Sequence, residues 1–280
     1  MLRSMYSGIS GMSNFQKKLD VIGNNISNVN TYGFKKGRTT FKDVWSQQIT
    51  GAAPRQVFKG GVNPKQAGLG VQLSAINNIH TQGSLQTTGR ALDLSISGEG
   101  FFMVGKGENG TITDKKYTRS GNFYLDQNGH VVNSDGDYLI KAVPNPANPL
   151  TAILYIPVTI PPTAQNVSIG KDGTIGYTDQ NGNNVVEGVI PLAKFSNPEG
   201  LEKSGSNAFV ETANSGEPIY SWPGEDGTGT IVSGALEMSN VDLSEELTEM
   251  ITAQRGFQAN TRIISTSDEI MQEIANLRKF

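Results

Sequence analysis

Two stretches rich in glycine and acidic residues have the spacing of known ligand-binding motifs. Residues 105–110, GKGENG, match the G-x-G-x-x-G pattern that places a dinucleotide pyrophosphate at a helix N-terminus. The next residues, TITDKKYT, favour a strand, so the helix is missing and we predict a hairpin loop. Residues 133–137, NSDGD, place oxygens at alternate positions as a calcium loop does. However, Tyr138 stands where that loop needs glycine and Pro144 where it needs an acid, so we predict a simple turn.

Residue types for nucleophilic or metal chemistry are sparse. The chain has no cysteine, which excludes disulfides, thiolate metal sites and cysteine nucleophiles. His80 and His130 are the only histidines, and neither has a second histidine or a carboxylate at a metal-ligand spacing such as i+4. We interpret each as a lone surface or turn histidine. Because no G-x-S-x-G nucleophile elbow is present either, the sequence predicts no enzyme, no cofactor and no metal site.

Composition narrows the class of protein further. The 280 residues carry a formal charge of −3 and show no clustered basic face of the kind that binds nucleic acid. No stretch approaches the roughly 20 apolar residues of a membrane span, and residues 1–19 lack the apolar core of a cleaved secretory signal. We therefore expect neither nucleic-acid binding nor membrane insertion, and any export must use a route without a cleaved signal. The 33 glycines predict many turns and short strands.

The elements that would position functional residues differ between the chain ends and the middle. Apolar residues recur at steps of three and four from the N-terminus, which predicts one amphipathic helix of about thirty residues. They are Leu2, Met5, Ile9, Met12, Phe15, Leu19, Ile22, Ile26 and Val29. Near the C-terminus an apolar residue returns every seven positions, as in the heptad seam of a coiled coil. Its members are Leu243, Met250, Phe257, Ile264 and Met271, joined by Leu247, Ile270, Ile274 and Leu277. Asp242 and Glu245, at capping-box spacing, predict where this helix begins.

Between the helices the sequence indicates a β-rich body. Residues 92–97, LDLSIS, and 154–160, LYIPVTI, alternate apolar side chains at the strand period. Turn signals follow at short spacing at residues 126–129, 134–137 and 171–173, and each contains residues that tolerate left-handed backbone. Many short strands joined by tight turns are therefore expected.

We predict an α+β fold in which long N- and C-terminal helices form a coiled-coil-like inner domain with the β-rich body inserted between them. The expected domains are a terminal helical domain at residues 1–32 and 240–280, an extended linker or hairpin segment at 33–75, and a β-rich outer domain at 76–239. Within the segment, residues 46–70 carry Gly, Pro, Gln and Ala without periodicity, which indicates an extended or loop-like connection.

The two apolar stripes need partners, because an apolar helix face in water is costly and an isolated helix is marginally stable. One solution is that the helices pair within one monomer and form a stalk. Tyr6, Ile251, Ile263 and Ala275 widen the stripes beyond a two-helix seam, which indicates more than one neighbour. A contact between identical chains that is not self-complementary adds subunits head to tail and forms an open helical polymer. A filament subunit is the leading hypothesis, with a soluble enzyme and a monomeric adhesin or binding module as alternatives.

Four stretches resemble one family. Residues 19–38, LDVIGNNISNVNTYGFKKGR, are similar to the N-terminal signature of the bacterial flagellar axial proteins, the rod and hook family. Residues 239–260, SNVDLSEELTEMITAQRGFQAN, resemble the matching C-terminal signature. Residues 82–104, QGSLQTTGRALDLSISGEGFFMV, and 117–132, YTRSGNFYLDQNGHVV, agree as well. Together these matches lie at both ends and in the middle of the chain, so they are more specific than any single motif above.

The resemblance implies a structural subunit outside the cytoplasm, in the flagellar hook or basal body. It implies terminal helices packed as an inner tube, export by the flagellar type III apparatus, and contacts with itself and with neighbouring axial proteins of the rod, hook cap and hook–filament junction. GLGVQLSAI from Gly68, SGALEMSNVDLS from Ser233 and the ending ANLRKF look more like the hook protein, a bending universal joint that transmits torque. The distal rod protein, a straight drive shaft, is the alternative, because the chain has little room for an additional outer domain.

The asparagines of NNISNVNTYGFK, residues 24–35, invite a physical hypothesis. Each amide can donate and accept, so asparagines can satisfy backbone groups where the helix ends and can cross-link packed neighbours without charge. Gly33 then permits a corner that a residue with a Cβ would resist. With the apolar seams, this gives the residues expected at the subunit interface. They are Leu2, Met5, Ile9, Met12, Leu19, Ile22, Asn24, Asn25, Ile26, Asn28, Val29, Asn30, Gly33, Phe34, Leu243, Leu247, Met250, Ile251, Phe257, Asn260, Ile264, Met271, Ile274 and Leu277.

Overall fold

The computed structural model describes residues 2–55, 60–108, 111–144 and 153–277. The chain divides into two compact units. The helical unit contains Met1–Ser27, Gly37–Asn78 and Asp242–Phe280, and the β unit contains Asn28–Lys36 and Ile79–Val241. The predicted α+β class, with packed terminal helices and a β-rich insertion, is confirmed. The domain boundaries predicted above stay a prediction.

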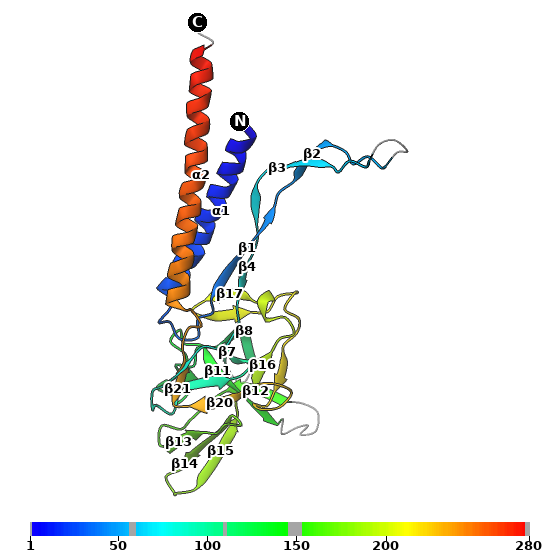
Figure 1. The fold of residues 1–280 in the computed structure, drawn as a ribbon. Coiled ribbons are helices and arrows are strands. Elements are labelled where there is room, and N and C mark those ends of the chain that lie inside the picture. Colours follow the sequence, from blue (N-terminus) through cyan, green and yellow to red (C-terminus); the bar gives the residue numbers. More distant parts are fainter. Residues whose placement is uncertain (1, 56–59, 109–110, 145–152, 278–280) are drawn as a thin grey trace. The chain divides into compact units, whose positions relative to one another are not determined.

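In the helical unit, α1 (Leu2–Ser27) and α2 (Leu243–Leu277) pack side by side and antiparallel (Figure 1). The helix α1 ends at Ser27, earlier than the periodicity predicted, because the chain turns there and Thr31 N donates to Asn28 O at 3.1 Å. Asp242 caps α2 as predicted, since its Oδ1 accepts from Ser244 N at 2.8 Å. No helix among the described residues is both long and apolar enough to cross a membrane.

The packed face of α2 alternates apolar residues with small and polar ones. Met250, Phe257, Ile264 and Met271 are half-buried there, whereas Leu243 is 44% exposed. The positions between them hold Glu246, Ala253, Asn260 and Ser267, which are buried or half-buried. The heptad seam is therefore real, but it begins one step later than predicted, and three of these eight positions are polar.

Glycines set how closely the two helices approach. A Cβ built on Gly256 would lie 2.6 Å from a ring carbon of Phe15, and one on Gly11 would lie 2.8 Å from Oδ1 of Asn260. Glycine at these positions lets each helix backbone contact a side chain of the other helix directly. This close packing explains why small and polar residues, and not only large apolar ones, fill the seam.

Replacement of these glycines gives a matched stability prediction. Gly256→Ala should lower the free energy of unfolding by about 1 to 2 kcal/mol, because overpacking outweighs the gain in helix propensity. Gly23→Ala should raise it by about 0.5 to 1 kcal/mol, because nothing lies within 4 Å of the added Cβ and only the propensity gain remains. Urea unfolding followed by circular dichroism measures both. Equal stabilisation of the two variants would contradict the close helix packing.

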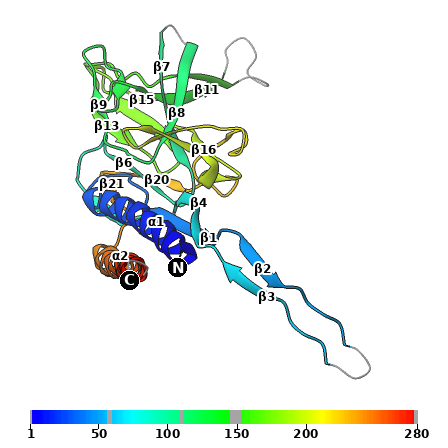
Figure 2. The same cartoon turned by 90° about the horizontal axis from the view of Figure 1, so that it is seen from above.

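The rest of the helical unit is a long two-stranded hairpin. Its strands β1 (Gly37–Asp43) and β4 (Val71–Asn78) pair antiparallel, with an irregularity between Thr40 and Phe41. Further along, β2 (Ser46–Thr50) pairs with β3 (Lys65–Gly68), and the two project as an arm (Figure 2). The stretch predicted as an extended or loop-like connection is thus partly strand.

The β unit is built from short strands. The first group comprises β5 (Leu85–Thr87), β6 (Leu94–Ser97), β7 (Phe101–Glu108), β8 (Thr111–Thr118), β9 (Tyr124–Leu125), β10 (Val131–Val132), β11 (Tyr138–Pro144) and β12 (Ile153–Pro157). The second comprises β13 (Gln165–Ile169), β14 (Thr174–Thr178), β15 (Asn184–Val189), β16 (Leu192–Lys194), β17 (Glu202–Gly205), β18 (Ala208–Val210), β19 (Ile219–Ser221), β20 (Thr230–Ser233) and β21 (Ala235–Glu237), with one 3-10 turn at Pro198–Gly200. Among the described residues, thirteen strands join one sheet with the main order β13-β14-β15-β11-β7-β8-β18-β17.

Strand β7 is central because both of its faces are buried. Phe102 and Val104 belong to one apolar core, and Phe101 and Met103 belong to a second core on the other face. All four side chains are almost fully buried. The alternation of side chains along a strand thus divides the β unit into two cores.

The turns and loops predicted from glycine signals are present. Gly129 N donates to Asp126 O at 2.9 Å and Gly173 N to Gly170 O at 3.0 Å. In the calcium-like stretch, Asn133 Oδ1 accepts from the backbone N of Asp135 and of Asp137, which is a turn held by its own side chain. Of the GKGENG stretch, which was predicted to be a hairpin loop, the first four residues lie in strand β7, which pairs with β8 as a hairpin, and residues 109–110 lie outside the described residues.

Candidate structural site

The TYGF corner that follows α1 is buried in the β unit. Gly33 has a φ of 70°, and its N donates to the carbonyl oxygen of Glu237 at 2.8 Å. A Cβ at this position would lie 2.6 Å from the backbone N of Ser120. Phe34 is buried next to it, with Lys203 Nζ 5.0 Å from the centre of its ring. Glycine is therefore required at the corner both by backbone conformation and by space, as the sequence predicted.

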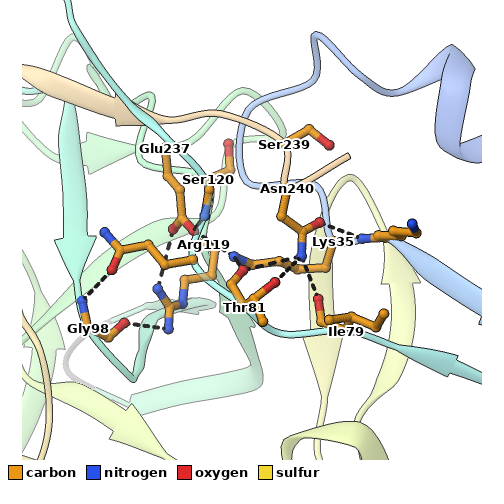
Figure 3. Close-up of polar contacts among 12 residues, drawn as sticks. Lys35, Ile79, Thr81, Gly98, Arg119, Ser120, Glu237, Ser239 and Asn240 are labelled. Atoms are coloured by element: carbon orange, nitrogen blue, oxygen red, sulfur yellow. Dashed lines mark hydrogen bonds and ion pairs between the residues drawn. The ribbon is translucent and has the colours of Figure 1, made fainter. Parts of the chain in front are cut away.

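Three charged side chains, Lys35, Arg119 and Glu237, form what we call the junction cluster (Figure 3). Lys35 Nζ lies 2.6 Å from Glu237 Oε1, and Arg119 Nη1 lies 3.3 Å from Glu237 Oε2. The side chains of Lys35 and Glu237 are completely buried. Burial lowers the pKa of both Lys35 and Arg119, and the carboxylate of Glu237 opposes that effect.

Backbone groups complete the junction cluster. Lys35 Nζ donates to Thr81 O at 2.8 Å and Arg119 Nη2 donates to Gly98 O at 2.9 Å, while Gly83 N donates to Glu237 Oε1 at 3.0 Å. The cluster thus ties together the segment after α1, the segment after β4, strand β21 and the end of β8. Because Lys35 and Glu237 are 202 residues apart, it fixes how distant parts of the chain enter the β unit.

Asparagine amides perform the same task without charge. In the β unit, Asn240 Oδ1 accepts from Lys36 N at 2.8 Å, and its Nδ2 donates to Ile79 O at 2.8 Å (Figure 3). In the helical unit, Asn25 pairs with the backbone of Gly37, donating to its O and accepting from its N, both at 2.9 Å. Asn25 also donates to Glu246 Oε2 at 3.1 Å. Asn25 therefore satisfies backbone and cross-links neighbours as hypothesised, and Asn240 is a residue that the hypothesis missed.

His80 differs from the sequence interpretation of a lone surface or turn histidine. It is half-buried, and neither ring nitrogen has a hydrogen-bond partner among the described residues. Its ring packs edge-on against Phe101 and Phe209. Burial, and next the positive charges of Lys35, Arg119 and Lys203, lower the pKa of His80 to about 4. His130, in contrast, does lie at a turn, where its Nδ1 is 3.1 Å from Thr159 Oγ1.

The lowered pKa of His80 predicts a loss of stability in acid. The unfolded chain takes up this proton near the ordinary value of 6.5, whereas the folded chain takes it up only near 4. The free energy of unfolding should therefore fall by up to about 3 kcal/mol between pH 6.5 and pH 4 through this residue alone. Urea unfolding across this range should show a shallower pH slope for His80→Phe, with His130→Phe as the control. An unchanged slope for His80→Phe would contradict the assignment.

The residues predicted at the subunit interface fall into two groups. Those buried or half-buried within the chain are Met5, Met12, Leu19, Ile22, Asn25, Ile26, Asn28, Val29, Gly33, Phe34, Met250, Phe257, Asn260, Ile264 and Met271. Those exposed are Ile9, Asn24, Asn30, Leu243, Leu247, Ile251, Ile274 and Leu277. The side chain of Leu2 lies outside the described residues. The interface itself stays a prediction, and the second group exposes more of its surface than the first.

The exposed apolar residues of α2 form two stripes. Leu243, Leu247 and Ile251 make the first stripe, in the N-terminal part of the helix. Ile263, Ile270, Ile274 and Leu277 make the second stripe, in the C-terminal part. At about 100° per residue, the two stripes lie on opposite sides of the face that packs on α1. Each stripe therefore presents apolar surface that α1 does not cover.

No arrangement for metal binding is present in the part of the chain that the structure describes. No three His, Asp or Glu side chains there gather closely enough to hold a metal ion. The buried charges that do occur are paired with each other and with backbone, which is typical of a structural role. The contacts of this site can hold segments that are distant in the sequence in fixed positions relative to one another within the β unit.

Comparison with known families and proteins agrees with this structural role. Three family profiles match: "Flagella basal body rod protein" at residues 5–35, "Flagellar hook protein FlgE/F/G D1 domain" at 95–177, and "Flagellar basal body rod FlgEFG protein C-terminal" at 232–277. The chain is 51% identical over 280 residues, the full length of both proteins, to the flagellar basal-body rod protein FlgG of Bacillus subtilis.

Hook proteins are also related to the chain. It is 33% identical over 446 aligned positions to the flagellar hook protein FlgE of Borreliella burgdorferi, an alignment that covers 99% of this chain and all of the hook protein. The basal-body rod protein FlgG of the same organism is 36% identical over 282 positions. The terminal signatures, the buried corner within the first of them and these full-length similarities agree, and the chain belongs to the flagellar rod and hook family of axial structural proteins.

Proposed function

We propose that this chain is the distal rod subunit of the flagellar basal body, a straight drive shaft, and not the hook subunit that the motifs near Gly68 and Ser233 suggested. The full-length 51% identity to a rod protein carries the proposal. The hook relatives support the alternative less well, because their alignments extend to 446 and 470 positions and this chain has only 280 residues. A hook role stays the second candidate on the strength of that relationship.

The proposed mechanism is polymerisation through the helical unit. The first stripe and the second stripe of α2 lie on opposite sides of the α1 contact, so one chain can engage two different neighbours. Contacts that are not self-complementary extend into an open helical assembly. The proposed partners are therefore further copies of this chain, then neighbouring axial proteins at each end of the shaft, with the flagellar type III apparatus for export.

The hairpin arm offers a second surface for neighbours. Trp45, between β1 and β2 where the arm begins, is 77% exposed, and Ile49, within β2 of the arm, is 64% exposed. Large apolar side chains at such exposure favour a protein contact over solvent. We propose that in the shaft this arm lies against an adjacent subunit.

Complementation distinguishes the rod from the hook. The chain is expressed in a Bacillus subtilis strain that lacks FlgG and, in parallel, in one that lacks its hook protein. Swimming and electron micrographs of isolated basal bodies are the readouts. Restoration of a complete rod only in the first strain is expected. Restoration of a hook in the second strain, with no rod in the first, would overturn the proposal in favour of the hook.

A further inference from the structure

The β unit contains the same four residues, DQNG, twice, at 126–129 and at 179–182. Both copies form the same turn. In each, the glycine N donates to the aspartate O at 2.9 Å, and the glycine φ is 82° in turn 126–129 and 80° in turn 179–182. Asn128 and Asn181 are both exposed. Each turn therefore presents to solvent an asparagine that is followed directly by glycine.

Turn 126–129 is fixed to the core of the β unit. The carbonyl oxygen of Gly129 accepts from Ile160 N at 2.7 Å, and a Cβ added to Gly129 would lie 2.1 Å from Ile160 O. Next to the turn, Val131 N donates to Val158 O at 3.0 Å. Val131, Val158 and Ile160 all belong to a buried apolar core. Because that core is closely packed, the backbone of this turn cannot move without disturbing it.

Turn 179–182 lies instead at the tip of the β14–β15 hairpin. A Cβ added to Gly182 would meet nothing within 4 Å, and Gly182 is exposed whereas Gly129 is buried. The side-chain amide of Asn181 donates to Asp179 Oδ2 at 3.2 Å, within the turn itself. Opening this turn breaks local hydrogen bonds and moves no core residue. Exposed segments of this kind open at the lowest free-energy cost in a folded protein.

Asparagine followed by glycine is the dipeptide that deamidates most readily, because glycine has no Cβ to shield its backbone nitrogen. That nitrogen gives its proton to hydroxide and attacks the asparagine Cγ. The side-chain nitrogen leaves as ammonia, and a five-membered succinimide ring remains. Water then adds to either ring carbonyl and opens the ring to aspartate or isoaspartate. The net reaction consumes water and releases ammonia, and it needs no oxidant, reductant or cofactor.

We propose that Asn181 is a site of spontaneous deamidation and that Asn128, in a turn of the same sequence and hydrogen bonding, is protected. Closing the succinimide ring rotates the peptide plane between asparagine and glycine. The open space around Gly182 allows this rotation, whereas the contacts with Ile160 oppose it at Asn128. The product places a carboxylate beside Asp179 where an amide donated to it. Like charges repel, so the modification should loosen the tip of the β14–β15 hairpin.

Peptide mass spectrometry tests the proposal on the full-length folded protein. The protein is incubated at mildly alkaline pH, samples are digested with pepsin in acid, and tandem mass spectrometry locates each amide that has become a carboxyl. We expect Asn181 to deamidate at least about tenfold faster than Asn128, with isoaspartate among the products. Equal rates, a faster reaction at Asn128 or no reaction at Asn181 would overturn the proposal.

The same chain unfolded in guanidinium chloride is the matched control. Each asparagine then lies in the same DQNG sequence but has lost its surroundings, so the two rates should agree within about twofold. A preference for Asn181 that persists in the unfolded chain would mean that the flanking sequence, and not the fold, sets the rates. That result would overturn the structural assignment.

Two variants test the assignment through the ammonia that the folded protein releases. Asn181→Gln should lower the release, because glutamine has to close a six-membered ring and does so more slowly. Asn128→Gln should leave the release unchanged. Residues 109–110, an Asn-Gly pair outside the described residues, add the same background to both variants. Equal release from the two variants would contradict the proposal. Unassembled chain is used throughout, so the outcome does not depend on the proposed rod function.

Discussion

Chains that carry both Leu247→Asp and Ile251→Asp are expected to remain folded monomers at concentrations at which the parent chain forms tubes. Both residues belong to the first stripe of α2 and are 45% and 53% exposed. Complete burial of such a side chain contributes about 1.5 to 3 kcal/mol. A carboxylate at the same place would instead have to lose its water without a partner. Because every subunit carries the change, the critical concentration for assembly should rise at least about 100-fold.

Sedimentation and negative-stain microscopy measure this loss of assembly. The matched control is the double variant Thr248→Asp and Thr252→Asp, which adds the same charge at the same four-residue spacing, at exposed positions that belong to neither stripe of α2. Circular dichroism and gel filtration should show both doubly substituted proteins folded. Tubes formed by Leu247→Asp/Ile251→Asp at the parental concentration would show that the first stripe does not lie at a subunit interface.

The terminal helices could be predicted because their signal is local. Apolar residues at steps of three, four and seven specify a helix face whatever lies far away in the chain. The polar positions of the seam could not be predicted in the same way, because a count of apolar residues passes over Glu246 and Ser267. The signal that was available is Gly11 and Gly256, whose missing side chains allow the helices to approach closely.

The junction cluster is the part of the site that sequence reasoning missed. Lys35 and Arg119 lie in stretches that resemble the family signature, and Glu237 lies in the hook-like stretch from Ser233. A charged residue nevertheless gives no periodic signal that would distinguish a buried position from an exposed one. The burial of His80 could not be predicted for a similar reason, because the rings that pack against it, Phe101 and Phe209, come from other parts of the chain. Local sequence patterns thus predict helices and strands. Buried polar contacts between distant segments can be identified only when the three-dimensional structure is known.

The junction cluster gives the largest expected effect on stability. Glu237→Gln leaves two buried cations, Lys35 and Arg119, without their carboxylate. Removal of one partner from a buried ion pair typically costs about 3 to 5 kcal/mol, which is a large share of the roughly 5 to 15 kcal/mol that holds a folded protein together. We expect Glu237→Gln to lower the free energy of unfolding of the β unit by that amount.

Lys35→Met tests whether charge balance is the cause. This variant keeps one buried ion pair, Arg119 with Glu237, whereas Glu237→Gln leaves two buried cations without a carboxylate. It should therefore cost less than Glu237→Gln, and adding Lys35→Met to Glu237→Gln should recover part of the loss. Glu202→Gln, on an exposed strand of the same unit, is the control and should change stability by less than about 0.5 kcal/mol. Urea unfolding of the four variants measures the order. If Lys35→Met costs as much as Glu237→Gln, packing and not charge balance stabilises the junction.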